Sequence, residues 1–78
     1  MRYPDGQEAR LGDRVELWIG NEGTVVCSID TGEYQSEFPK EQWAYLGEGV
    51  LVLSEKGGLV HYKVPEPTMR LLSRFSAS

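Results

Sequence analysis

Residues 14 to 19 alternate between aliphatic side chains and charged or aromatic ones. Val15, Leu17 and Ile19 fall on one side of an extended chain, and Arg14, Glu16 and Trp18 fall on the other. A period of two residues is typical of a β-strand that buries one face. The pattern therefore predicts a strand with an aliphatic inner face and an outward Trp18.

A returning strand follows this one directly. The segment Gly20-Asn21-Glu22-Gly23 contains two glycines and predicts a tight reversal, and the β-branched residues between Thr24 and Ile29 predict the second strand of a hairpin. We expect Val25, Cys27 and Ile29 to share the apolar face of that strand.

The second half of the chain predicts another hairpin. A continuous apolar run at 50–53 predicts a buried strand, residues 55–58 form the turn, and residues 59–64 return before Pro65-Glu66-Pro67 ends the strand. Residues 69–75 fit a strand and a short helix equally well. Near the N terminus, Gln7 to Arg10 predict a short edge strand.

The segment between the two hairpins has a different pattern. Pro39 suits the first position of a helix and Gly47 suits a helix end, so residues 38–47 predict one or two helical turns. A 3₁₀ turn and an irregular loop are the alternatives. In a helical segment, Phe38, Trp43 and Leu46 are expected to point inward.

Together these elements predict the fold class. About five short strands and one short helical turn, in a single domain spanning residues 1–78 with nine glycines and four prolines, indicate an all-β protein. Closing the strands into a small barrel removes most unpaired strand edges, so a barrel is the expected architecture.

Composition narrows the cellular environment. The single cysteine excludes an internal disulfide, which small secreted domains usually need. No stretch approaches the ~20 apolar residues of a membrane span, and the first residues contain no apolar run of signal-peptide length. We therefore expect a cytoplasmic protein that does not enter a membrane.

Charge is distributed unevenly along the chain. The net charge is −4, with −6 on residues 1–48 and +2 on residues 49–78. An acidic domain is repelled by phosphate at long range, so this balance disfavours nucleic acid as a partner. The plain interpretation of the charge is solubility, and a basic partner for the acidic half is the alternative.

The first hairpin carries a resemblance to a known family. Residues 12–26 read Gly-Asp-Arg-Val-Glu-Leu-Trp-Ile-Gly-Asn-Glu-Gly-Thr-Val-Val and resemble the KOW motif, a Gly-Asp pair followed by two alternating strands around a glycine-containing turn. The resemblance implies an SH3-like barrel that contacts RNA, the ribosome or a transcription complex. The available cations for such a contact are Lys56, Lys63, Arg70 and Arg74. The KOW turn usually carries lysine or arginine, whereas this one is shorter and carries Glu22.

The chain as a whole also resembles small proteobacterial proteins. The shared features are a Tyr-Pro-Asp-Gly start and a Trp-Ala-Tyr-Leu segment, found here at residues 3–6 and 43–46. This resemblance implies no activity.

Residues suited to catalysis or metal binding are few. One histidine and one cysteine do not make a structural zinc site in a monomer, so neither a metal nor another cofactor is expected. Cys27 and His61 form a nucleophile and its base only if the fold brings them together, and Cys27 on an apolar face is more simply an inert core residue. Acidic residues of the long loop (Glu33, Glu37 and Glu41) are expected to be solvated. We therefore expect a protein that is not an enzyme.

Aromatic residues are the candidates for binding. The residues expected to contact a partner are Trp18, Tyr34, Trp43, Tyr45 and Tyr62. Large amphipathic side chains commonly anchor interfaces, and in SH3-like barrels the aromatics at one end often form a peptide groove. Core packing is the alternative for Trp43, and packing under the long loop is the alternative for Trp18.

The leading functional hypothesis is a non-enzymatic binding module for a protein or peptide. The first alternative is the KOW-type contact with RNA, the ribosome or a transcription complex. The second is an immunity-type inhibitor of a basic toxin. Short edge strands and an exposed Trp18 also allow a homodimer.

Overall fold

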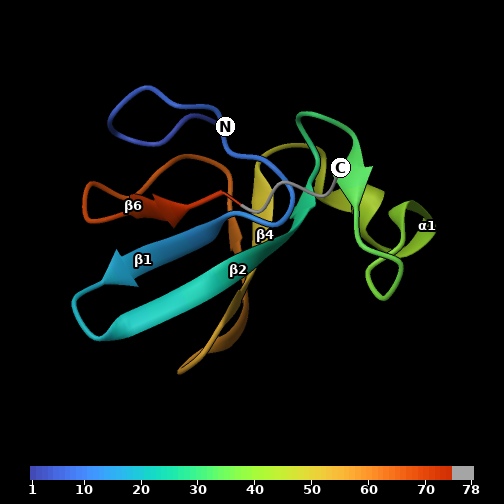
Figure 1. The fold of residues 1–78 in the computed structure, drawn as a ribbon. Coiled ribbons are helices and arrows are strands. Elements are labelled where there is room, and N and C mark those ends of the chain that lie inside the picture. Colours follow the sequence, from blue (N-terminus) through green and yellow to red (C-terminus); the bar gives the residue numbers. More distant parts are fainter. Residues whose placement is uncertain (75–78) are drawn as a thin grey trace.

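The computed structural model describes residues 1–74 and contains one antiparallel sheet (Figure 1). The strands are β1 (Arg14–Trp18), β2 (Asn21–Ser28), β3 (Glu33–Tyr34), β4 (Val50–Ser54), β5 (Gly58–Tyr62) and β6 (Arg70–Ser73). The helical segment consists of α1 (Lys40–Trp43) and the 3₁₀ turn η1 (Ala44–Leu46). The expectation of an all-β fold with one short helical segment is confirmed. Within residues 1–74 no helix is long and apolar enough to cross a membrane.

The strand order is β5-β4-β2-β1-β6, with the short β3 paired to the far end of β2. β2 lies at the centre of the sheet and pairs with β1 along its first half and with β4 along most of its length. The last strand returns to pair with β1. The sequence allowed a strand or a short helix over residues 69–75, and the structure shows a strand at residues 70–73. Phe75 lies outside the described residues.

The reversal between β1 and β2 lies earlier than the sequence predicted. Trp18 pairs with Asn21, so the turn consists of Ile19 and Gly20, and Gly20 has a φ of 88°. Ile19 is consequently 93 % exposed instead of belonging to the apolar face. Gly23, which the sequence placed in the turn, is a residue of strand β2. Glycine is required there by the close approach of β4, because a Cβ would lie 2.7 Å from Val52 Cγ1.

The main core lies on one face of the sheet and is closed by the N-terminal segment. Its buried members are Tyr3, Ala9, Val15, Leu17, Val25, Val50, Val52, Tyr62 and Met69. The N-terminal segment is a compact loop in which Tyr3 N donates to Gln7 O and Ala9 N donates to Met1 O. The predicted edge strand over Gln7–Arg10 is wrong, because only an isolated bridge between Arg2 and Glu8 forms there.

A β-bulge in β2 creates a second core on the opposite face. Val25 pairs with Val52 and Cys27 pairs with Leu51, so Val26 is an extra residue in β2 relative to β4. A bulge interrupts the alternation of side chains. Val25 therefore joins the main core, while Val26 and Cys27 both join a second cluster with Leu51. The expectation that Val25 and Cys27 share one face is wrong for this reason, although both are buried as expected.

Gly49 joins the helical segment to β4 under a tight steric constraint. Its φ is 90°, and a Cβ at this position would lie 2.9 Å from Lys63 Cα and closer still to the carbonyl oxygen of Tyr62. The Gly49 carbonyl also accepts a hydrogen bond from Ile29 N at 2.9 Å. Any side chain here therefore clashes with the backbone that follows β5 as well as straining its own backbone.

We predict that Gly49→Ala lowers the free energy of unfolding by about 2–4 kcal/mol, the sum of left-handed strain and overpacking. The matched control is Gly32→Ala, where φ is 72° but nothing lies within 4 Å of the added Cβ. That control is expected to cost only about 1 kcal/mol. Urea unfolding followed by tryptophan fluorescence measures both, and equal losses would contradict the steric role of Gly49.

Candidate functional site

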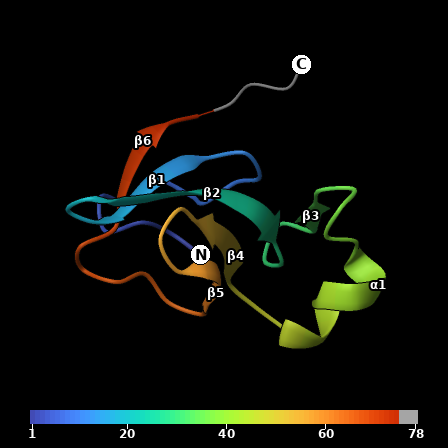
Figure 2. The same cartoon turned by 90° about the horizontal axis from the view of Figure 1, so that it is seen from below.

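Residues 33–48, which we call the lobe, lie at one end of the sheet and contain β3, α1 and η1. Figures 1 and 2 show α1 at the end of the molecule opposite the β1–β2 turn. The lobe is attached through the second cluster, where Tyr34, Phe38, Trp43 and Leu46 pack against Val26, Cys27 and Leu51. The inward orientation predicted for Phe38, Trp43 and Leu46 is therefore confirmed.

The helical segment begins and ends at the residues that the sequence indicated. Pro39, with φ of −70°, was predicted as the first helical residue and is instead the N-cap of α1, one position before Lys40. Gly47, with φ of 85°, ends η1, and its N–H donates to Ala44 O. The change from α1 to η1 places Trp43 and Tyr45 within two residues of each other on a short, turning segment.

Three neighbouring aromatic rings of the lobe form what we call the aromatic face (Phe38, Trp43 and Tyr45); the first pair is tilted by 48° and the second is stacked. The ring centroids of Phe38 and Trp43 lie 6.3 Å apart, and those of Trp43 and Tyr45 lie 6.4 Å apart with planes inclined by 25°. Trp43 is partly buried on the second cluster, whereas Tyr45 is 77 % exposed. Offset stacking of this kind holds an exposed ring in a defined orientation.

The indole N–H of Trp43 is buried without a hydrogen-bond partner in the described structure. A buried donor with no acceptor costs about 1–3 kcal/mol. The aromatic face thus contains a polar group that packing has covered but not satisfied, directly beside the most exposed ring of the lobe.

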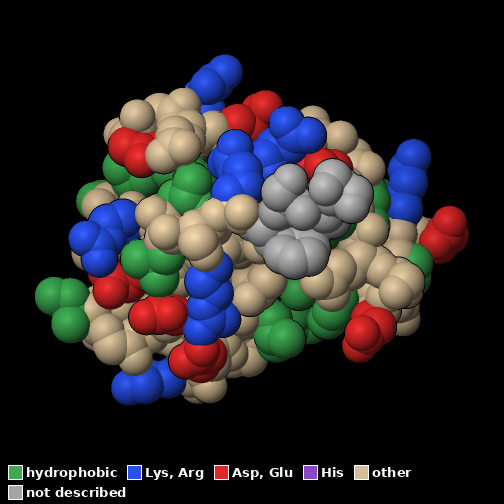
Figure 3. Space-filling model, viewed as in Figure 1, with side chains coloured by type: hydrophobic (Ala, Val, Ile, Leu, Met, Phe, Trp, Pro, Cys, Tyr) green, Lys and Arg blue, Asp and Glu red, His purple; other side chains and the backbone are tan. Residues whose placement is uncertain are grey.

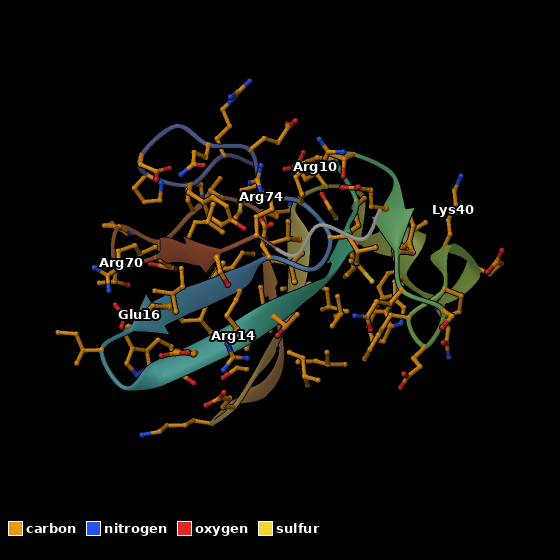
Figure 4. The ribbon with its side chains drawn as sticks, viewed as in Figure 1. Arg10, Arg14, Glu16, Lys40, Arg70 and Arg74 are labelled. Carbon is orange, nitrogen blue, oxygen red and sulfur yellow. The ribbon has the colours of Figure 1, made fainter. Side chains whose placement is uncertain are left out.

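The lobe is acidic. It contains Glu33, Glu37, Glu41 and Glu48 and a single cation, Lys40, for a net charge of −3. Glu37, Glu41 and Glu48 are exposed, and their carboxylates have no ion pair within residues 1–74. Figure 3 shows acidic side chains at this end of the molecule, and Figure 4 shows Lys40 there, apart from the arginines over the sheet.

Glu33 is the exception, because its carboxylate fixes the base of the lobe. Its Oε1 accepts hydrogen bonds from Arg10 Nε at 2.9 Å, Leu11 N at 3.3 Å and Thr31 Oγ1 at 2.7 Å, while Arg10 Nη2 lies 3.2 Å from Oε2. The guanidinium of Arg10 and the other donors lower the pKa of Glu33 to about 2. The lobe is therefore tied to the N-terminal segment as well as to the second cluster.

The arginines on the sheet have acidic partners of their own. Arg70 pairs with Glu16 at 3.5 Å, Arg74 Nε lies 3.1 Å from Asp13, and Arg14 pairs with Glu55 and Glu22. An open pocket of about 520 Å³ lies beside them and is lined by Gly12, Arg14, Thr24, Gln35, Ser73 and Arg74. Because both of its guanidinium groups already face carboxylates, the pocket carries little free charge.

The five predicted contact residues do not form one surface. Trp43 and Tyr45 lie together, and Tyr34 supports them from the second cluster. Trp18 is outward as predicted, 49 % exposed, but lies at the opposite end beside the β1–β2 turn. Tyr62 is only 9 % exposed and belongs to the main core, where burial raises its pKa, so its expected place on a binding surface is wrong.

The sequence interpretation treated Glu41 only as a solvated acid and did not consider Glu48. Glu41 precedes Tyr45 by four residues, a spacing that places two side chains on one side of a helix. Glu48 follows the helix end, and its carbonyl lies 2.8 Å from His61 Nε2. The four-residue spacing between Glu41 and Tyr45 could be seen in the sequence once a helix was expected there. The position of Glu48 depends on its contact with β5, which no nearby residue pattern indicates.

Cys27 and His61 do not form a reactive pair. They lie on β2 and β5, and Leu51 of β4 pairs with both, so the two side chains are separated by two strand spacings, about 10 Å. Burial raises the pKa of the Cys27 thiol, and Sγ donates to Phe38 O at 3.4 Å. Within residues 1–74 no three His, Cys, Asp or Glu side chains are grouped so as to hold a metal ion.

We predict that the stabilisation from Glu33 disappears at acid pH. Its pKa in the folded state is about 2 against 4.5 for the ordinary group, so the contribution is complete above pH 4.5 and is lost as the pH falls toward 2. At pH 7, Glu33→Gln is expected to lower the free energy of unfolding by about 1–2 kcal/mol, allowing for solvent screening. Urea unfolding at pH 7 and pH 2.5 tests this, and a difference from wild type that does not shrink with acid would contradict it.

Comparisons with known proteins give no match for this chain. No protein-family model matches the chain, and neither a curated protein nor a solved structure matches it. The candidate site therefore rests on geometry: an exposed tyrosine stacked on a fixed tryptophan, with three carboxylates of the same lobe that have no ion pair within residues 1–74.

Proposed function

We propose that this protein is a non-enzymatic binding module and that the aromatic face of the lobe contacts a protein or peptide partner. The observation that carries the proposal is Tyr45, which is 77 % exposed yet held by stacking on Trp43. A rigid aromatic ring offers a large contact area and loses little side-chain entropy on binding, which is why tyrosine and tryptophan are frequent anchors of interfaces.

The architecture supports the same proposal. A meander of antiparallel strands whose first strand also pairs with the last, as in the order β5-β4-β2-β1-β6, supports an SH3-like barrel. The KOW resemblance of residues 12–26 points to the same fold. In such barrels the loops at one end commonly recognise peptides, and here the longest insertion, residues 29–49, carries the aromatic face. The single, buried thiol of Cys27 supports a cytoplasmic setting.

The nucleic-acid alternative receives less support. Two of its four cations, Arg70 and Arg74, pair with Glu16 and Asp13. The remaining Lys56 and Lys63 flank β5, whose Tyr62 is buried in the main core and not open to a base. We keep RNA binding as an outcome of the test below.

We predict that Tyr45→Ala weakens binding of the physiological partner about tenfold or more, the loss expected for a central aromatic anchor. The experiment immobilises wild-type protein, captures its partner from an extract of the source cells, identifies that partner and measures its affinity with purified material. Trp18→Ala is the control, because it removes another exposed aromatic side chain, 49 % exposed, at the opposite end of the molecule.

Retention of full affinity by Tyr45→Ala, or equal loss with Trp18→Ala, would count against the aromatic face as the binding surface. Recovery of RNA in place of a protein, with affinity that falls steeply as salt rises, would favour the KOW-type contact. A captured second copy of this chain, with a size that depends on concentration, would assign the surface to a homodimer.

A further inference from the structure

One face of the Tyr45 ring is free for contact. The ring stacks on Trp43 with its plane inclined by 25°, and the side chain as a whole is 77 % exposed. The contact with Trp43 is therefore offset, and most of the Tyr45 ring faces solvent. The π-face of an aromatic ring carries negative potential and attracts cations, and a planar guanidinium can also stack on it.

The acids of the lobe other than Glu33 have no ion-pair partner within residues 1–74. Glu41 lies four residues before Tyr45 and Glu48 three residues after it, and Glu37 precedes the helical segment. None of the three forms an ion pair within residues 1–74, in contrast to the acids of the sheet, where Asp13, Glu16, Glu22 and Glu55 each face an arginine. Of the six described acids without an ion pair, three (Glu37, Glu41 and Glu48) thus belong to the lobe that carries the exposed ring, and the other three are Asp5, Glu8 and Glu66.

We propose that the aromatic face recognises a cationic, arginine-bearing segment of the partner. One guanidinium stacks on the open face of Tyr45, and neighbouring cations of the segment pair with Glu41 and Glu48. This inference rests on the proposed function and specifies the chemistry of the partner. Charge complementarity selects the occupant, since an acidic or phosphate-bearing partner would meet three uncompensated carboxylates.

A second copy of this chain fits the surface less well than a separate partner. Arg10, Arg14, Arg70 and Arg74 already pair with carboxylates of their own chain. Arg2 donates to Gly6 O within the N-terminal loop. Freeing one of these groups for a neighbouring molecule breaks an existing contact, whereas an extended cationic segment brings guanidinium groups that are solvated and free.

The test is an NMR titration of the whole protein at low salt with three short peptides, in which glycine alternates with arginine, lysine or glutamate. The arginine peptide is expected to bind about threefold to tenfold more tightly than the lysine peptide, because stacking on the ring adds to the charge. The amide of Tyr45 and the indole N–H of Trp43 are expected to shift, and the glutamate peptide is expected not to bind.

Variants of the ring separate stacking from charge. Tyr45→Leu keeps apolar bulk but removes the π-face, so the preference for arginine over lysine is expected to vanish, while Tyr45→Phe is expected to preserve it. Glu41→Gln and Glu48→Gln are each expected to weaken both cationic peptides about twofold to fivefold, an effect that disappears at high salt. Lys40→Gln is expected to act in the opposite direction and tighten binding.

Equal affinities for arginine and lysine in wild type, unchanged affinities in Tyr45→Leu, or no shift at millimolar arginine peptide would each overturn the inference. The partner captured as described above separates this failure from failure of the proposed function. A partner whose binding depends on Tyr45 but not on Glu41 and Glu48 leaves the binding surface standing and removes its cationic specificity. A partner indifferent to all three residues removes both.

Discussion

The buried carboxylate of Asp13 joins the parts of the chain on which the whole sheet depends. It is fully buried and accepts hydrogen bonds from Tyr3 Oη at 2.6 Å, Arg10 N at 2.9 Å and Arg74 Nε at 3.1 Å. Its backbone also bonds to Val25 N. One side chain thus connects the N-terminal loop, the start of β1 and the end of β6. Burial and this carboxylate raise the pKa of Tyr3, so the phenol stays a donor throughout the physiological range. Removal of Asp13 would leave the Tyr3 hydroxyl without its acceptor and Arg74 without its ion pair, in a domain with little stability to spare.

Asp13 thus ties the N-terminal loop to the strands, and the bulge at Val26 gives β2 two separate roles. Its first half supplies Val25 to the main core, and its second half supplies Val26 and Cys27 to the cluster under the lobe. The lobe can therefore vary in its exposed residues without disturbing the main core. Rigidity still passes from the sheet to the aromatic face, because Trp43 packs directly on residues of β2 and β4 and Glu33 is held by Arg10. A binding surface set on a fixed scaffold avoids the entropy cost of ordering a loop on association.

Local pattern predicted most of the fold and only part of the site. The two hairpins follow from alternation and glycine placement, and the helical turn follows from Pro39 and Gly47, because such signals act within a few residues. The turn position at Ile19–Gly20 and the bulge at Val26 depend on which β4 residues lie opposite β2, which is a property of long-range pairing. For the same reason Tyr62 could not be assigned to the core from the sequence, since that core is assembled from distant segments that include Tyr3 and Met69. Tyr45 could be predicted as a surface residue from the sequence, because Trp43 and Tyr45 flank Ala44 and cannot easily both be buried.

Net charge alone is a poor guide to the partner of a domain like this one. The net charge of −4 combines two surfaces on which the charged side chains are arranged differently. Over the sheet, acids and arginines are interleaved and satisfy one another, so that surface contributes stability and solubility but little long-range field. On the lobe, the acids outnumber the single Lys40 and are mostly unpaired within residues 1–74. In the complex that we propose, the partner responds to the local charge of the lobe rather than to the total. In that proposed complex the aromatic face favours arginine over lysine, because a planar guanidinium can stack on the ring in addition to the attraction that any cation feels.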